Sequence, residues 1–151
     1  AEELAKKYAL APYTMFIGSG ALWGETILYS MCILEEMQWK RTRYITSHDF
    51  FHGTLELLEP GVPVFLFKGE DECRELDNRV EAFLRSGVTG DEDYVIFDTA
   101  EFAIPGLDPD FRVIVSPWIL TVCITDRLSR HYEMVTKHNL KYRRYYHQFD
   151  Y

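Results

Sequence analysis

Glu36 and His52 are two side chains whose types and positions suit acid–base chemistry. Glu36 closes an expected helix, and a carboxylate at that end opposes the helix dipole, so something other than helix stability is expected to keep it there. His52 lies in a loop after a short strand, beside Gly53, which permits close backbone approach. A carboxylate and an imidazole form a natural pair for moving protons. Taken alone, each residue also leaves a plain alternative, a solvated glutamate and a structural histidine.

Two further segments offer contacts for an anion. The turn Gly18-Ser19-Gly20 lies between an apolar run and a helical pattern, so its backbone N–H groups could cradle an anionic group. It lacks the third glycine of a dinucleotide fingerprint and the lysine of a phosphate loop, and a plain tight turn stays an alternative. Arg143 and Arg144 stand beside two tyrosines, where they could clamp an anionic substrate or a partner chain, or pack at the surface.

Short apolar runs alternate with longer amphipathic stretches, and this alternation predicts the elements that must position those residues. Strands are expected at 13–17, 44–46, 62–67 and 94–97, with a fifth at 112–115. Helices are expected at 2–9, 21–38, 54–59, 72–86 and 117–138, with a turn at 87–90. The pattern predicts an α/β fold, a three-layer sandwich around a five-stranded parallel sheet of the flavodoxin type.

Composition excludes several classes of function. The net charge of -8 argues against nucleic acid as a partner, because phosphate backbones require a clustered basic surface. No apolar run approaches the roughly 18 residues of a membrane span, and the chain opens with AEELAKKY rather than with an apolar leader. Three widely spaced cysteines form neither a metal-binding nor a disulfide pattern. We expect a cytoplasmic protein that needs no metal and no cofactor.

The stretch from Phe16 to Asp71 resembles the second SIS (sugar isomerase) domain of two-domain phosphosugar enzymes. That family includes the isomerase half of glucosamine-6-phosphate synthase and the deglycases of Amadori products. Glu36 matches the glutamate at the family's helix end, and residues 49–53 match its Glu/Asp-x-x-His-Gly loop, with aspartate in place of the commoner glutamate. The segments EEMQW, FFHGTLEL and FLFKGED are most similar to deglycases that act on 6-phosphofructose-aspartate. Thr54 stands where the fructoselysine-type relatives usually have proline, which leaves the amino-acid part of the substrate open.

The resemblance implies a deglycase that cleaves a 6-phosphorylated Amadori product, such as 6-phosphofructose-aspartate, to glucose 6-phosphate and a free amino acid. Glu36 would be the base that moves the proton between C1 and C2, and His52 would open the sugar ring. Binding of the phosphorylated sugar–amino acid conjugate is assigned to Gly18, Ser19, Gly20, Thr54 and Arg144. An aldose–ketose phosphosugar isomerase, a non-catalytic module that senses sugar phosphates and a pure dimerisation domain remain alternatives.

The expected unit is a single SIS domain over residues 1–151, the C-terminal half of a two-domain protein. The Ser/Thr-rich phosphate loop of the family's first domain is missing from this sequence.

A helix that follows a strand ends at the opposite edge of the sheet, and a five-residue strand separates the two edges by roughly 16 Å. Glu36 and His52 of one chain are therefore expected either to act in separate sites or to meet across an interface between chains. The resemblance favours the interface, because the family builds its sites between SIS units and takes the histidine from a neighbouring subunit, and we expect a homodimer with its active site between subunits.

Overall fold

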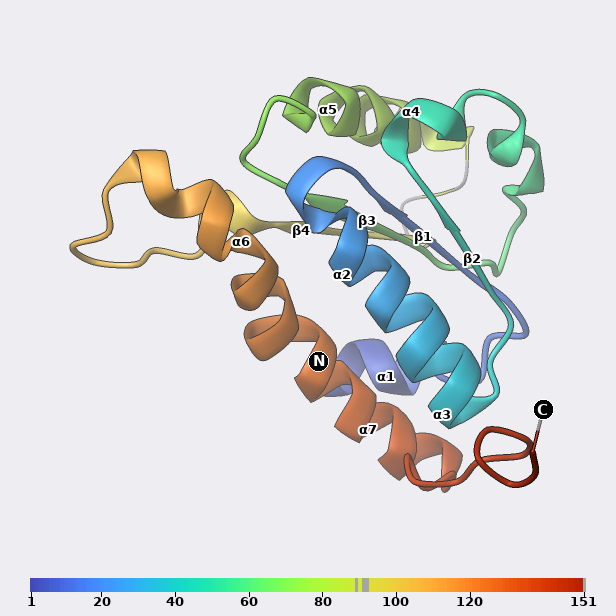
Figure 1. Ribbon diagram of the computed structural model, residues 1–151. Coiled ribbons are helices and arrows are strands. Elements are labelled where there is room, and N and C mark those ends of the chain that lie inside the picture. The colour runs from blue at the N-terminus through green and yellow to red at the C-terminus, as the bar shows by residue number, and fades with distance from the viewer. Residues whose placement is uncertain (89, 91–92, 151) are drawn as a thin grey trace.

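The computed structural model describes residues 1–88, 90 and 93–150, which Figure 1 shows as three layers. The middle layer is a parallel sheet of β1 (Thr14–Gly18), β2 (Thr42–Ile45), β3 (Val64–Lys68) and β4 (Tyr94–Asp98). Its strand order is β2-β1-β3-β4. This is the order of the first four strands in flavodoxin-like sheets, which bind ligands where the connections diverge, beyond β1 and β3.

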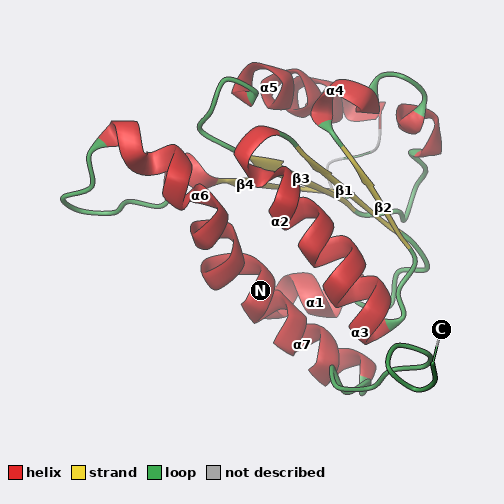
Figure 2. Cartoon of the chain, in the orientation of Figure 1, coloured by secondary structure: helices red, strands yellow, loops and turns green. Residues whose placement is uncertain are grey.

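Helices cover both faces of the sheet (Figure 2). The α-helices are α1 (Glu2–Tyr8), α2 (Trp23–Ile27), α3 (Glu36–Gln38), α4 (Ser47–Phe50), α5 (Arg74–Phe83), α6 (Arg112–Leu120) and α7 (Asp126–Thr136). Turns of 3-10 helix lie at Gly20–Leu22, Thr54–Leu57, Thr99–Glu101 and Pro109–Phe111. Segments of π-helix lie at Leu28–Glu35, Leu84–Val88 and Thr121–Thr125. The alternation of strands and helices expected from the sequence is confirmed.

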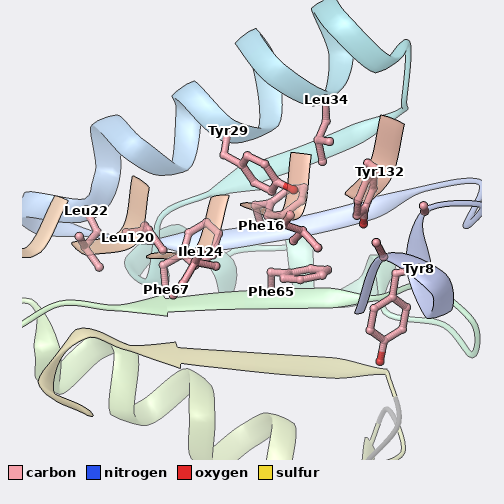
Figure 3. Close-up of a cluster of buried hydrophobic side chains, with 13 residues drawn as sticks. Tyr8, Phe16, Leu22, Tyr29, Leu34, Phe65, Phe67, Leu120, Ile124 and Tyr132 are labelled. Carbon is pink, nitrogen blue, oxygen red and sulfur yellow. The ribbon is translucent and has the colours of Figure 1, made fainter. Parts of the chain in front are cut away.

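Each face of the sheet carries its own core because neighbouring residues of a strand point to opposite sides. Phe16, Phe65 and Phe67 pack on one side with α1, with the helical run that contains α2 and with the run from α6 to α7, as Figure 3 shows. The rings of Phe16 and Phe65 stack with centroids 5.2 Å apart. Met15 and the other alternate strand residues pack on α4 and α5, with Phe50 fully buried among them. Both faces of the sheet are thus covered, which leaves the loops at its two ends as the places where a site can form.

The prediction of a fifth strand was wrong. Residues 112–115 begin helix α6, and the sheet has four strands within the described part of the chain. Asp108 caps this helical run by accepting a hydrogen bond from the Asp110 N–H (2.9 Å), and Pro109 occupies its first turn, so a segment expected to be a turn starts a helix. The β-branched residues that suggested a strand are tolerated in a helix that packs on its neighbours.

Pro117 lies inside α6 instead of at the start of a helix as expected. A proline there cannot donate to the carbonyl four residues earlier. The Ser116 hydroxyl donates to the Val113 carbonyl at 3.0 Å and so supplies the missing donor. The turn expected at 87–90 includes Thr89, which lies outside the described residues. In the part of the chain that the structure describes, no helix has both the length and the apolar character needed to cross a bilayer.

Candidate functional site

Glu36 lies at the end of a helical run whose geometry changes just before it. The π-helical segment Leu28–Glu35 ends at the preceding residue, and π-helical segments frequently occur at functional sites. Trp39 ends the run in the left-handed conformation, with a φ angle of 52°. The Lys40 N–H closes the cap by donating to the Leu34 carbonyl at 2.9 Å. Positive φ is uncommon for a bulky side chain and persists only where the surroundings hold it in place.

The segment that follows α7 supplies those surroundings. Gln38 is buried, and its amide donates to the His138 carbonyl at 2.6 Å. The His138 ring packs edge-on against Trp39 with centroids 4.4 Å apart. Arg143 Nε contacts Glu36 Oε1 at 2.8 Å, and the Arg144 guanidinium lies 4.2 Å above the Trp39 ring. The chain after α7 is therefore fastened across the end of α3.

These contacts border an open pocket of about 400 Å³ beside Glu36. Its volume falls within the range of small-molecule sites. The lining residues are Glu35, Glu36, Trp39, Lys40, Arg143, Arg144, Tyr145 and Tyr146. Glu35 is engaged by the Thr42 hydroxyl, which donates to it at 2.5 Å, whereas Glu36 pairs with an arginine. The structure thus brings Glu36 and Arg144, two residues selected from the sequence, into one pocket.

The glycine turn lies at the opposite edge of the sheet, where β1 ends. Gly20 has a φ of 54°, and a Cβ atom there would lie 2.2 Å from Asp71 Oδ2, so this position requires glycine. The Ala21 N–H donates to that same carboxylate oxygen at 2.5 Å. The Ser19 hydroxyl accepts a hydrogen bond from the Ser47 N–H at 2.8 Å. The turn is therefore tied to the loops after β2 and β3.

Asp77, which the sequence analysis did not select, completes this network from α5. Its side chain is fully buried and accepts hydrogen bonds from the Ser47 hydroxyl (2.5 Å) and the Gly69 N–H (3.3 Å). Burial raises the pKa of Asp77 to about 6 despite these hydrogen bonds. A signal was present in the sequence, because Asp77 lies three residues before buried Val80, on the same helix face. An aspartate on an apolar helix face predicts a buried carboxylate that accepts hydrogen bonds from another part of the chain.

His52 and Thr54 follow α4 in the loop beyond β2. His52 is exposed, and its ring lies 5.3 Å from that of His48. Thr54 is buried, and its hydroxyl accepts a long hydrogen bond of 3.5 Å from Arg43 of β2. Ser47 opens α4 and is bonded to Ser19, so this loop adjoins the glycine turn.

The predicted site residues thus fall into two groups. Gly18, Ser19 and Gly20 adjoin the loop of His52 and Thr54, whereas Glu36 and Arg144 lie in the pocket. Figure 1 shows α3 at the start of β2 and α4 at its end. A four-residue strand such as β2 extends for roughly 13 Å. One chain therefore does not bring Glu36 and His52 to the same substrate atom. Among the residues that the structure describes, no group of His, Cys, Asp or Glu side chains could hold a metal ion.

The chain is similar to enzymes of phosphorylated sugars. It is 29% identical over 155 residues to the fructosamine deglycase of Bacillus subtilis, a match that covers 100% of this chain and 45% of the deglycase. It is 32% identical over 113 residues to the fructoselysine 6-phosphate deglycase of Escherichia coli K12, covering 75% of this chain and 31% of that enzyme. No family model matches the sequence.

The fold itself matches a solved structure. A crystal structure from Bacillus subtilis, described as that of a phosphosugar isomerase, superposes with a TM-score of 0.91 at 27% identity. The superposition covers 99% of this chain and 44% of that protein. The chain therefore has the fold of the SIS phosphosugar isomerases, as the sequence predicted. It spans less than half the length of the relatives that it matches.

Proposed function

We propose that this chain, which has the SIS fold and is a relative of the phosphosugar deglycases, forms part of an enzyme that removes the amino acid from a 6-phosphorylated Amadori product. Glucose 6-phosphate and the free amino acid are the products, and 6-phosphofructose-aspartate or a similar conjugate is the substrate. The observation that carries the proposal is the pocket in which the Glu36 carboxylate lies beside Arg143 and Arg144 of the chain after α7. The similarity to deglycases of fructosamine and fructoselysine 6-phosphate supports it.

The chemistry of such a substrate requires an acid–base pair. After the sugar ring opens, a base removes a proton from C1 and an enaminol forms. Protonation at C2 converts the enaminol into an imine between C1 and the amino-acid nitrogen. Addition of one water molecule then breaks the C1–N bond and gives an aldehyde sugar and the free amine. These proton transfers need groups within about 3 Å of the reacting atoms.

Glu36 is proposed as the base at C1 and C2, and His52 as the group that opens the ring. The Glu36 side chain is about 29% exposed at the pocket wall, which suits a group that must reach a bound sugar. His52 is exposed at the other edge of the sheet and is free to face a second protein unit. Gly18, Ser19, Gly20, Thr54 and Arg144 are proposed to bind the substrate, and these roles follow from the family resemblance.

An exposed apolar surface supports assembly of the site between units. Ile114, Trp118 and Val122 recur every four residues along α6 and the segment after it, with exposed fractions of 65%, 70% and 55%. Phe111 adds to the same stretch. Contiguous apolar patches of this kind mark protein–protein contacts. We propose that the chain is the C-terminal half of a two-SIS-domain cytoplasmic protein and works as a homodimer, with sites shared between subunits.

The direct test is to supply the full-length protein with 6-phosphofructose-aspartate and to quantify the released amino acid and glucose 6-phosphate. The proposal predicts both products in equal amounts, and much less of either from the unphosphorylated conjugate. An aldose–ketose isomerase with the same base would interconvert fructose 6-phosphate and glucose 6-phosphate but release no amine. Isomerisation without amine release would overturn the deglycase proposal in favour of that alternative.

Substitutions at the two proposed catalytic residues test their roles. Glu36→Gln and His52→Ala should each lower kcat/KM by about 100-fold or more, the usual scale for general acid–base groups. Glu35→Gln and His48→Ala are matched controls, because these neighbours share the helix end and the loop but have no proposed role in proton transfer. Near-normal turnover of either catalytic variant would refute the assignment of that residue.

A further inference from the structure

The pocket beside Glu36 has a charge pattern that a sugar alone does not require. Its wall carries three cations, Lys40, Arg143 and Arg144, and two carboxylates, Glu35 and Glu36. One positive charge is therefore in excess locally, in a chain whose net charge is -8. A cation gathered into a pocket against the overall charge of the protein favours an anionic ligand there.

The cations of the pocket differ in how they are engaged. Lys40 Nζ donates to the Ala11 carbonyl at 2.6 Å, which turns the ammonium away toward the start of β1. Arg143 pairs with Glu36, and it also donates to the Leu140 carbonyl at 2.8 Å. The Arg144 guanidinium lies 4.2 Å above the Trp39 ring, and within residues 1–88, 90 and 93–150 no carboxylate forms an ion pair with it. Arg144 is exposed at the mouth of the pocket, with its donors available to a ligand.

Stacking on Trp39 prepares Arg144 for a planar anion. A guanidinium held over an indole ring keeps the N–H groups of its edge free, and those groups match a carboxylate in a two-point contact. The left-handed backbone of Trp39 and the edge-on contact with His138 hold the indole ring in this position. A ligand carboxylate on Arg144 would also lie beside Arg143, the neighbouring residue that holds Glu36.

We propose that the Arg143–Arg144 pair forms a carboxylate subsite for the amino-acid part of the substrate, and that a carboxylate bound there draws Arg143 away from Glu36. This inference rests on the proposed function and assigns the anion at this edge to the amino acid, not to the sugar phosphate. The subsite couples recognition to catalysis: Arg144 gives affinity for the carboxylate, and the transfer of Arg143 leaves Glu36 free to accept the C1 proton. Conjugates of amines without a carboxylate would then bind weakly and also react slowly.

The test uses a matched pair of substrates with the full-length protein. The 6-phosphofructose conjugates of glycine and methylamine differ only in the carboxylate. The wild type should prefer the glycine conjugate by about 10- to 100-fold in kcat/KM, the scale of a charge-assisted hydrogen-bonded pair. In Arg144→Gln, the two conjugates should no longer differ in KM. In Arg143→Gln, they should no longer differ in kcat.

Arg130→Gln is the control, because Arg130 is an exposed arginine of α7 that pairs with Asp126. It should keep the full wild-type preference. Equal turnover of the two conjugates by the wild type, or an unchanged preference in Arg144→Gln, would overturn the subsite while leaving the deglycase proposal intact. Release of amine from neither conjugate would instead contradict the proposed function.

A binding measurement decides the subsite independently of turnover. N-methylglycine is titrated into the full-length protein while the indole resonance of Trp39, assigned with Trp39→Phe, is followed by NMR. A saturable shift in the wild type that is about 10-fold weaker in Arg144→Gln supports the subsite. The same spectra show whether each variant is folded. Absence of a shift in the folded wild-type protein would overturn the inference.

Discussion

Asp77 provides a prediction whose size follows from its burial. Its pKa is raised from the ordinary 3.8 to about 6, chiefly by desolvation, with Asp71 adding to the rise and Lys68 and the two hydrogen bonds opposing it. Folded Asp77 therefore keeps its proton at pH values at which unfolded Asp77 has lost it. The stability that it contributes is complete below about pH 4 and is lost as the pH rises through about 6. The full difference corresponds to about 3 kcal/mol of unfolding free energy.

Asp77→Asn removes this titration but keeps a side chain of the same shape. Its carbonyl can still accept from the Gly69 N–H, and its amide can donate to the Ser47 hydroxyl oxygen. Between about pH 4.5 and about pH 7.5, the unfolding free energy of the wild type should fall by about 2 kcal/mol more than that of Asp77→Asn.

Urea unfolding of the chain at both pH values measures the effect, because the midpoint and slope give the free energy at each pH. Asp126→Asn is the control, since Asp126 is an exposed carboxylate on α7 that pairs with Arg130. It should leave the pH dependence close to that of the wild type. If Asp77→Asn shows the same pH dependence as the wild type, the account of a buried, ionisable Asp77 is refuted.

Two further predictions concern the glycine turn and the apolar surface. Gly20→Ala should lower the unfolding free energy by about 1–3 kcal/mol, because Gly20 has a positive φ and the Asp71 carboxylate lies beside it. Gly24→Ala is the control, since Gly24 has open space around it and its substitution should not lower stability. Urea unfolding compares the two variants, and equal stabilities would contradict the prediction. Trp118→Glu should weaken self-association in sedimentation measurements without unfolding the chain. Leu10→Glu, at an equally exposed apolar position, should leave self-association unchanged. An unchanged assembly in Trp118→Glu would exclude this surface from the interface.

Much of the fold could be predicted from the sequence because the local signals agreed with one another. The apolar runs ending in glycine or lysine form β1 and β3, and the amphipathic stretch before Glu36 forms one helical run. The expected fifth strand failed for a local reason. Residues 113–115 are β-branched and apolar, a composition that fits a strand or a buried helix equally. The preceding Asp108-Pro109 caps the segment and starts a helix instead.

The candidate site could be predicted only in part. Glu36 and His52 were selected by residue type and by resemblance, and the placement of the two at opposite edges of the sheet follows from strand and helix order. The pocket of Glu36 depends on contacts across about 100 residues, such as that between Gln38 and His138, which no local pattern reveals. The position of Asp77 on the apolar face of α5 could have been noticed, but its hydrogen-bond partner Ser47 lies on another element and could not be predicted.

The central claim is that a working site combines Glu36 of one subunit with His52 of another. Mixing of Glu36→Gln and His52→Ala subunits, unfolded and refolded together, tests it through amine release from 6-phosphofructose-aspartate. In a homodimer, half of the mixed dimers are hybrids, and each hybrid has one site with both natural residues, so the account predicts recovery of about a quarter of the wild-type activity. Activity of the mixture no higher than that of the separate variants would contradict the shared site.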